Sequence, residues 1–157
     1  MSMLKRLAKE VYDQETLGGN LREEGIEWYQ DESDVKLLHA FIFGPIGSCY
    51  EGGVFEYEVR LPDDYPFKPP KFKAVTRLFH PEVTDLTDGT MHFISSCSAC
   101  GLGEWWSPAL TVTKVLKSAR DSMKAPDIDK LDCCSPTIRK TIEVSKEEFE
   151  SKAREWT

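Results

Sequence analysis

Four strand-like runs with short, turn-like separators constrain the fold of this chain more than any other feature. The clearest run covers residues 54–61, where apolar residues alternate with Glu56, Glu58 and Arg60. A period of two is typical of a strand with one buried face. The four runs are Ile26–Tyr29, Val35–Phe43, Val54–Leu61 and Phe72–Val75. We therefore predict a four-stranded antiparallel meander.

A helix is predicted before the strands, near the N-terminus. Its apolar residues recur three and four positions apart, which places them on one stripe: Leu4, Leu7, Ala8, Val11 and Tyr12. The basic residues Lys5, Arg6 and Lys9 lie off that stripe. The turn-forming sequence at residues 18–20 ends this helical region.

Helical patterns return in the second half of the chain. Prolines in the segment 63–71 exclude a helix or a central strand there. A second amphipathic helix is marked by Val112, Val115, Leu116, Ala119 and Met123. Ser135 before Pro136 predicts the start of a third helix. Ser145 and Glu148 fit a capping box at the start of a last helix. The apolar face of that helix consists of Phe149, Ala153 and Trp156. Since no repeat or linker interrupts these elements, we predict a single α+β domain over residues 1–157.

Composition narrows the classes of function. The chain has 157 residues, 40% of them hydrophobic and 30% charged, which is typical of a globular domain. Its formal net charge of −7 argues against a nucleic-acid partner, which requires a basic face. No apolar run approaches the roughly 20 residues that span a bilayer, so no membrane partner is expected. Five cysteines, an odd number, favour a reduced intracellular setting over a disulfide framework.

Six short segments carry a more specific pattern. They are Phe43–Pro45, Tyr50–Phe55, Asp64–Lys71, His80-Pro81, Trp106–Thr111 and Ala153–Thr157. In order and spacing they resemble the ubiquitin-conjugating enzyme family over nearly the whole chain. For most of these residues a structural role is expected, with Trp106 as a buried anchor and the proline-rich segment packed against the sheet. The resemblance implies the fold of that family.

The resemblance also implies a reaction and a set of partners. Family members accept ubiquitin or a related modifier from an activating enzyme as a thioester on one cysteine. They pass it to a substrate lysine, usually with a ligase holding both partners. A thiol suits this chemistry because its thiolate is a strong nucleophile. The activating enzyme uses the ATP, so no cofactor is expected for this chain, and a cytoplasmic or nuclear location is implied.

Two departures from the family pattern fall at the predicted active site. The usual His-Pro-Asn is replaced by His80-Pro81-Glu82, and an ionised carboxylate has no hydrogen-bond donor to offer to an oxyanion. The family segment Gly-x-Ile-Cys-Leu corresponds to Gly89–Phe93, in which His92 stands in place of the cysteine. Cys97 and Cys100 follow in a connection that is several residues longer than usual.

Two alignments of this segment remain open. If Gly89–Phe93 sets the register, the nucleophile has been lost to His92. If the distance to Trp106 sets it, Cys97 stands close to the position of the nucleophile. The leading hypothesis is an active enzyme that uses Cys97, favoured by the complete C-terminal segment 153–157. The alternative is an inactive variant that binds ubiquitin or a conjugating partner, favoured by Glu82 and His92.

Other roles are compatible with the residue types in this segment. His92 suits a general base, but it also suits a packed strand residue. Cys97 and Cys100 have the spacing of zinc ligands, yet a second pair with that spacing is missing, so no metal site is predicted. The remaining cysteines, Cys49, Cys133 and Cys134, are expected to be structural. The candidate catalytic residues are Cys97, Cys100, His80, Glu82, His92, Asp127 and Asp129.

The last two of these and the partner-binding residues rest on the resemblance. Asp127 and Asp129 lie near the acidic residues that orient or deprotonate the incoming lysine amine in the family. Basic residues on the first helix meet the activating enzyme, which here implies Lys5, Arg6 and Lys9; an ordinary solvated face is the other interpretation. The surface where ligases dock corresponds to Phe67, Ser107, Pro108 and Ala109.

Overall fold

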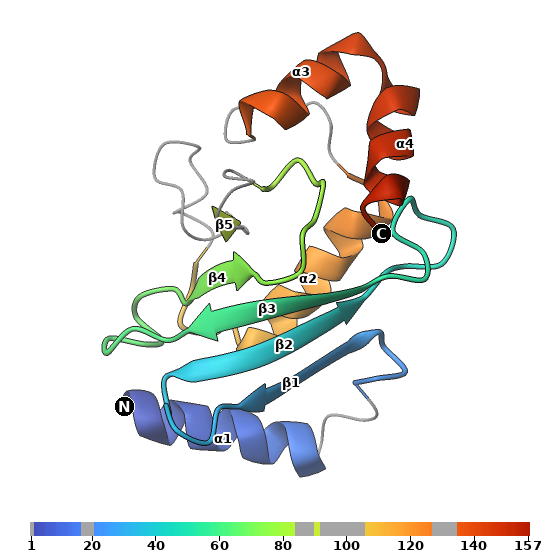
Figure 1. Ribbon diagram of the computed structural model, residues 1–157. Coiled ribbons are helices and arrows are strands. Elements are labelled where there is room, and N and C mark those ends of the chain that lie inside the picture. Colours follow the sequence, from blue (N-terminus) through green and yellow to red (C-terminus); the bar gives the residue numbers. More distant parts are fainter. Residues whose placement is uncertain (1, 17–20, 84–89, 92–105, 127–134) are drawn as a thin grey trace.

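A five-stranded antiparallel sheet with helices around it forms the protein (Figure 1). The computed structural model describes residues 2–16, 21–83, 90–91, 106–126 and 135–157. The helices are α1 (Met3–Thr16), α2 (Val112–Lys124), α3 (Pro136–Val144) and α4 (Lys146–Glu155). The strands are β1 (Ile26–Gln30), β2 (Leu37–Phe43), β3 (Val54–Arg60), β4 (Lys71–Ala74) and β5 (Thr90–Met91). No helix in the described ranges is long and apolar enough to cross a membrane.

The sheet confirms the predicted meander and adds one strand to it. Its strands are ordered β1-β2-β3-β4-β5, so each pairs with its neighbour in sequence. Strand β2 begins at Leu37 rather than Val35, because the amide of Leu37 donates to the carbonyl of Asp34 in a turn. The fifth strand was not predicted; it pairs with β4, with Met91 opposite Phe72 and Thr90 opposite Lys73.

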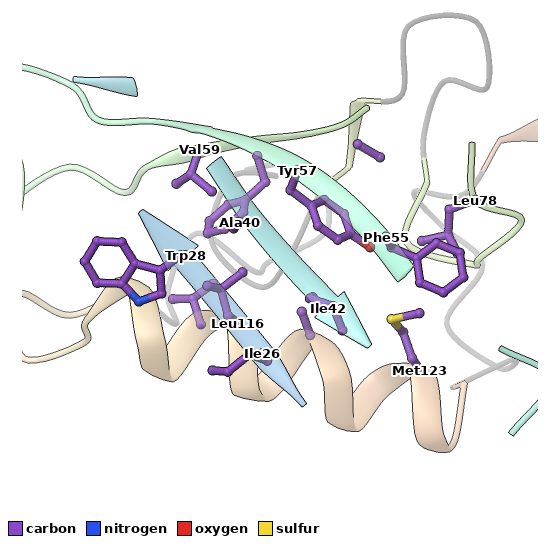
Figure 2. Packing of buried hydrophobic residues seen from close by; sticks show 14 of the residues in the cluster. Ile26, Trp28, Ala40, Ile42, Phe55, Tyr57, Val59, Leu78, Leu116 and Met123 are labelled. Carbon is purple, nitrogen blue, oxygen red and sulfur yellow. The ribbon is translucent and has the colours of Figure 1, made fainter. Parts of the chain in front are cut away.

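The core lies between the sheet and α2. Figure 2 shows the inward side chains of β1, β2 and β3 directed toward Leu116 and Met123 of α2. The labelled residues of the sheet that are buried in this cluster are Ile26, Trp28, Ala40, Ile42, Phe55, Tyr57 and Val59. Full burial of one large apolar side chain stabilises a fold by about 1.5–3 kcal/mol. In addition, the indole N–H of Trp28 donates to Thr113 Oγ1 at 3.0 Å, which ties β1 to the start of α2.

The buried face of α1 differs from the predicted stripe. The buried residues are Met3, Leu7 and Glu10, whereas Leu4 is 55% and Tyr12 62% exposed. Leu7 is buried and Val11 packs against the core, as predicted. The prediction was wrong for Leu4, Ala8 and Tyr12, which are exposed. It missed Glu10 because it excluded charged residues from the inner face. Glu10 is buried there because it meets hydrogen-bond donors from other segments, described below.

The last two helices begin at the predicted residues. Pro136 is the first residue of α3, although the side chain of Ser135 makes no capping hydrogen bond. The hydroxyl of Ser145 accepts from the amide of Glu148 at 3.0 Å and caps α4 as predicted. Phe149 and Ala153 of α4 are buried in the core cluster.

The connection between β2 and β3 depends on its glycines. Gly52 has a φ of +86°, a conformation that side chains disfavour. A Cβ atom on Gly44 would overlap the backbone carbonyl of Tyr50. Both glycines were among the segments that carried the family resemblance, and the structure gives them a steric reason.

Candidate active site and docking surfaces

Two loops at one end of the protein are held together by Trp106. Its indole N–H donates to the carbonyl of Pro66 at 2.6 Å, and its ring lies 5.9 Å from that of Tyr65. Tyr65 is buried, whereas Phe67, two residues later, is 67% exposed. Trp106 is half-buried and packs against the core, which fits its predicted role as an anchor.

This anchor brings the predicted ligase-docking residues to one surface. Ser107, Pro108 and Ala109 follow Trp106 directly and are all exposed. Their turn is closed by the amide of Leu110, which donates to the carbonyl of Ser107 at 2.8 Å. We call the exposed residues Phe67, Ser107, Pro108 and Ala109 the two-loop surface. An exposed aromatic ring therefore lies near an exposed, hydrogen-bonded turn.

The basic residues of α1 do not share one environment. Lys5 and Lys9 are exposed, as predicted. Arg6 is partly buried: its Nε lies 2.6 Å from Glu10 Oε1, and its Nη2 donates to the carbonyl of Leu110 at 2.7 Å. Arg6 is therefore engaged in contacts within the chain, whereas no ion pair of Lys5 or Lys9 occurs among the described residues.

His80 lies in a buried turn that follows β4 and contacts α2. Its Nδ1 accepts from the amide of Glu82 at 3.2 Å, and its Nε2 lies 3.4 Å from the carbonyl of Ser122. These partners require a neutral ring with the proton on Nε2. Burial lowers the pKa of His80 to about 4. Because both nitrogens are engaged and the ring is 1% exposed, the geometry fits a structural role and gives no support to a catalytic one.

Glu82 occupies the position where the family pattern has an asparagine. Its side chain is half-buried, with Oε2 3.3 Å from the hydroxyl of Ser122 on α2. That hydroxyl also lies 2.8 Å from the carbonyl of Ala119, so its one hydrogen is shared. The carboxylate of Glu82 thus faces the same helix that holds the ring of His80. A negative charge here offers acceptors but no donor.

The short strand β5 lies directly before His92. Its pairing with β4 places the backbone of Thr90 and Met91 at the end of the sheet. His92, Cys97, Cys100, Asp127 and Asp129 lie outside the described residues, and their predicted roles stay predictions. Within the described ranges, no group of three His, Cys, Asp or Glu side chains is placed to bind a metal ion.

Cys49 is the one cysteine that the described ranges contain. It is 6% exposed, and burial raises the pKa of its thiol. A buried thiol that resists ionisation is a poor nucleophile. The structural role predicted for Cys49 therefore agrees with its surroundings.

Three residues near these sites were not given a functional role from the sequence. Glu10 connects α1 to the two loops, Tyr65 donates to Glu10, and Ser122 connects the His80 turn to α2. The spacing of Arg6 and Glu10, four positions apart, was a signal for an ion pair on a helix. Nothing in the sequence singled out Ser122.

Comparisons with known proteins agree with this geometry. A sequence model of the family described as "Ubiquitin-conjugating enzyme" matches residues 6–157. The chain is similar to the E2 domain of a Toxoplasma gondii ubiquitin-conjugating enzyme, with 31% identity, a TM-score of 0.79, and coverage of 98% of this chain and 95% of that one. It is also similar to a Plasmodium yoelii protein described as a ubiquitin-conjugating enzyme, with 33% identity, a TM-score of 0.80, and coverage of 98% and 92%.

Proposed function

Because the chain belongs to the ubiquitin-conjugating enzyme family, we propose that it carries ubiquitin or a ubiquitin-like modifier as a thioester on Cys97. It then transfers the modifier to a substrate lysine with a ligase. The observation that carries this proposal is the two-loop surface, which the Trp106–Pro66 hydrogen bond holds together on a fold of this family. The partners proposed with this activity are the modifier, its activating enzyme, a ligase and the substrate lysine.

The proposed reaction consists of two acyl transfers. The thiolate of Cys97 attacks the thioester carbonyl of the modifier on the activating enzyme, whose own thiolate leaves. An uncharged lysine amine then attacks the Cys97 thioester, an isopeptide bond forms, and the Cys97 thiolate is released. The proton lost by the amine passes to a base, for which Asp127 and Asp129 are the candidates.

A second candidate function is a binding module without a nucleophile. The strand β5 favours it, because regular pairing of Thr90 and Met91 with β4 fits the alignment in which Gly89–Phe93 is the family's cysteine segment. In that alignment His92 takes the place of the cysteine. The chain would then bind ubiquitin or a conjugating partner and transfer nothing.

Charging assays separate these two functions. With activating enzyme, ATP and ubiquitin, or a related modifier, we expect an adduct on the parent chain that a thiol reductant removes. Cys97→Ser should abolish the adduct or convert it to an ester that resists the reductant. The matched control is Cys49→Ser, which should charge like the parent chain because Cys49 is buried.

Two results would change the assignment. An adduct that survives in Cys97→Ser but is lost in Cys100→Ser would make Cys100 the nucleophile. If the parent chain forms no adduct with any modifier, the proposed enzyme activity is contradicted. The alternative function, a binding module, would then be supported.

Reversal of the exposed charges on α1 tests the activating-enzyme contact. For the variant Lys5→Glu/Lys9→Glu we expect charging about tenfold slower at low ionic strength, because surface charges steer association. Added salt should reduce the difference. Stability should stay within about 0.5 kcal/mol of the parent value, since both side chains are exposed. Initial charging rates at low concentrations of activating enzyme measure the effect.

Lys140→Glu is a suitable control, because Lys140 is exposed on α3 and its reversal changes net charge without touching α1. If the α1 variant is charged at the parent rate, Lys5 and Lys9 do not contact the activating enzyme. They are then ordinary solvent-exposed residues.

A further inference from the structure

The carboxylate of Glu10 is buried where three segments of the chain meet. Glu10 is 5% exposed. Its Oε1 accepts from Arg6 Nε and from the hydroxyl of Tyr65, each at 2.6 Å. Its Oε2 accepts from the amide of Val112 at 2.9 Å. One side chain therefore holds α1, the proline-rich segment and the start of α2.

Two of these donors, Tyr65 and Val112, are close in sequence to the two-loop surface. Tyr65 precedes Phe67 by two residues, and Val112 follows the turn that carries Ser107, Pro108 and Ala109. Arg6 adds a fourth contact, because its Nη2 donates to the carbonyl of Leu110 at the end of that turn. The positions of both loops relative to α1 thus depend on the ion pair of Arg6 and Glu10.

The charge of Glu10 suits this place. The amide of Val112 is one of the first amides of α2, which have no partner within the helix. The positive end of the helix dipole attracts a carboxylate there. The hydroxyl of Thr111 caps the same helix locally by accepting from the amide of Lys114. Glu10 is the second acceptor at this helix start, and it comes from a different part of the chain.

We propose that Glu10 is a positioning residue of the ligase-docking surface. It sets the spacing between Phe67 and the turn of residues 107–109, and it does so from inside the protein without contact with the ligase. This inference rests on the proposed function, because it takes the two-loop surface as the place where a ligase binds.

The substitution Glu10→Gln removes one of the two acceptors and keeps the size of the side chain. If the amide oxygen accepts from Arg6 and Tyr65, the NH₂ group faces the amide of Val112. If the oxygen accepts from Val112, the NH₂ group faces Arg6. In either orientation a buried donor loses its acceptor, which is energetically costly. Movement of the affected loop away from α1 would let water satisfy that donor.

The test combines Glu10→Gln with Phe67→Ala in a double-mutant cycle. The probe is an isolated RING domain that binds the uncharged parent chain, selected from a panel of recombinant RING domains. We expect Glu10→Gln to weaken binding by at least about fivefold, because in either orientation of the amide a buried donor lacks an acceptor. In the background of Phe67→Ala the same substitution should have little further effect on binding.

Control variants separate positioning from general loss of stability. Glu15→Gln lies on the same helix but is exposed, and it should bind the RING domain like the parent chain. Tyr65→Phe keeps the charge of Glu10 and removes one donor, so its binding should fall between those of the parent chain and Glu10→Gln. If Glu10→Gln does not fold, the cycle of Tyr65→Phe with Phe67→Ala gives the same test.

The inference would be overturned if Glu10→Gln binds the RING domain like the parent chain. It would also be overturned if Glu10→Gln weakens binding equally in the parent chain and in the Phe67→Ala background. Failure of every RING domain to bind the parent chain would overturn both the ligase surface and this role of Glu10. Neither result depends on a thioester, because the uncharged chain is used. The charging assay therefore tests the proposed nucleophile independently of the ligase-binding experiment.

Discussion

Between pH 7 and pH 4, His80 alone is expected to lower the free energy of unfolding by about 3 kcal/mol. Burial lowers its pKa from 6.5 in the unfolded chain to about 4 in the folded protein. Over this range the unfolded chain binds a proton that the folded protein does not, so stability falls as the pH falls. The stability is unaffected by the titration of His80 well above pH 6.5, falls as the pH drops through 6.5 toward 4, and levels off about one pH unit below 4.

Urea titrations at several pH values measure this dependence. His80→Gln lowers stability at every pH through lost packing, but its profile should lack the decrease of about 3 kcal/mol. His39→Gln is the contrasting control. The hydrogen bond to Asp31 raises the pKa of His39, so His39 stabilises the fold at low pH, and its removal should make the decrease steeper. A profile for His80→Gln parallel to that of the parent chain would contradict the prediction.

Replacement of Glu82 by asparagine should accelerate lysine transfer. Provided that Cys97 carries the modifier, discharge of the thioester to free lysine should be about 100-fold faster in Glu82→Asn. One donor to a developing oxyanion is worth about 3–4 kcal/mol in well-studied hydrolases. The substitution adds such a donor and also removes a negative charge. Single-turnover discharge of purified thioester measures the rate apart from loading.

Ser122→Ala is the matched control for this variant. It removes the contact of Ser122 with Glu82 but adds no donor, so discharge should stay near the parent rate. If Glu82→Asn loads normally and discharges at the parent rate, Glu82 does not act at the reacting thioester. The His80 turn would then be structural only, and the hypothesis that Glu82 lies near a Cys97 thioester would lose its support.

The strands were predictable because their pattern reports burial directly. In residues 54–60 every second side chain is buried, as the alternation predicted. The strand β5 escaped prediction because two residues cannot show a period. Its pairing with Phe72 and Lys73 is a tertiary contact, which cannot be predicted from the local sequence.

The inner face of α1 was mispredicted for a different physical reason. A hydropathy pattern treats every carboxylate as a surface group, since burial of a lone charge is costly. Glu10 escapes that cost through donors at Tyr65 and Val112, which lie 55 and 102 positions away. A contact between residues so distant in sequence cannot be read from the periodicity of one helix.

The chemistry of the site was the least predictable part. The anchor role of Trp106 was predictable because packing dictates it, whereas ligase docking at the two-loop surface stays a prediction. The resemblance could not choose between His92 and Cys97, since the segment that holds both has no period from which a register can be deduced. Their roles and those of Asp127 and Asp129 remain predictions for the charging assays.

The contacts on either side of residues 84–105 have a consequence for chain entropy. Ser122 holds the His80 turn on one side, and Trp106 holds Pro66 on the other. The pairing of β5 with β4 fixes a further point between them. For any flexible connection between fixed points, the cost of closure grows only with the logarithm of its length, by about 0.6 kcal/mol for each doubling. Extra residues in such a connection would therefore change the free energy of unfolding little.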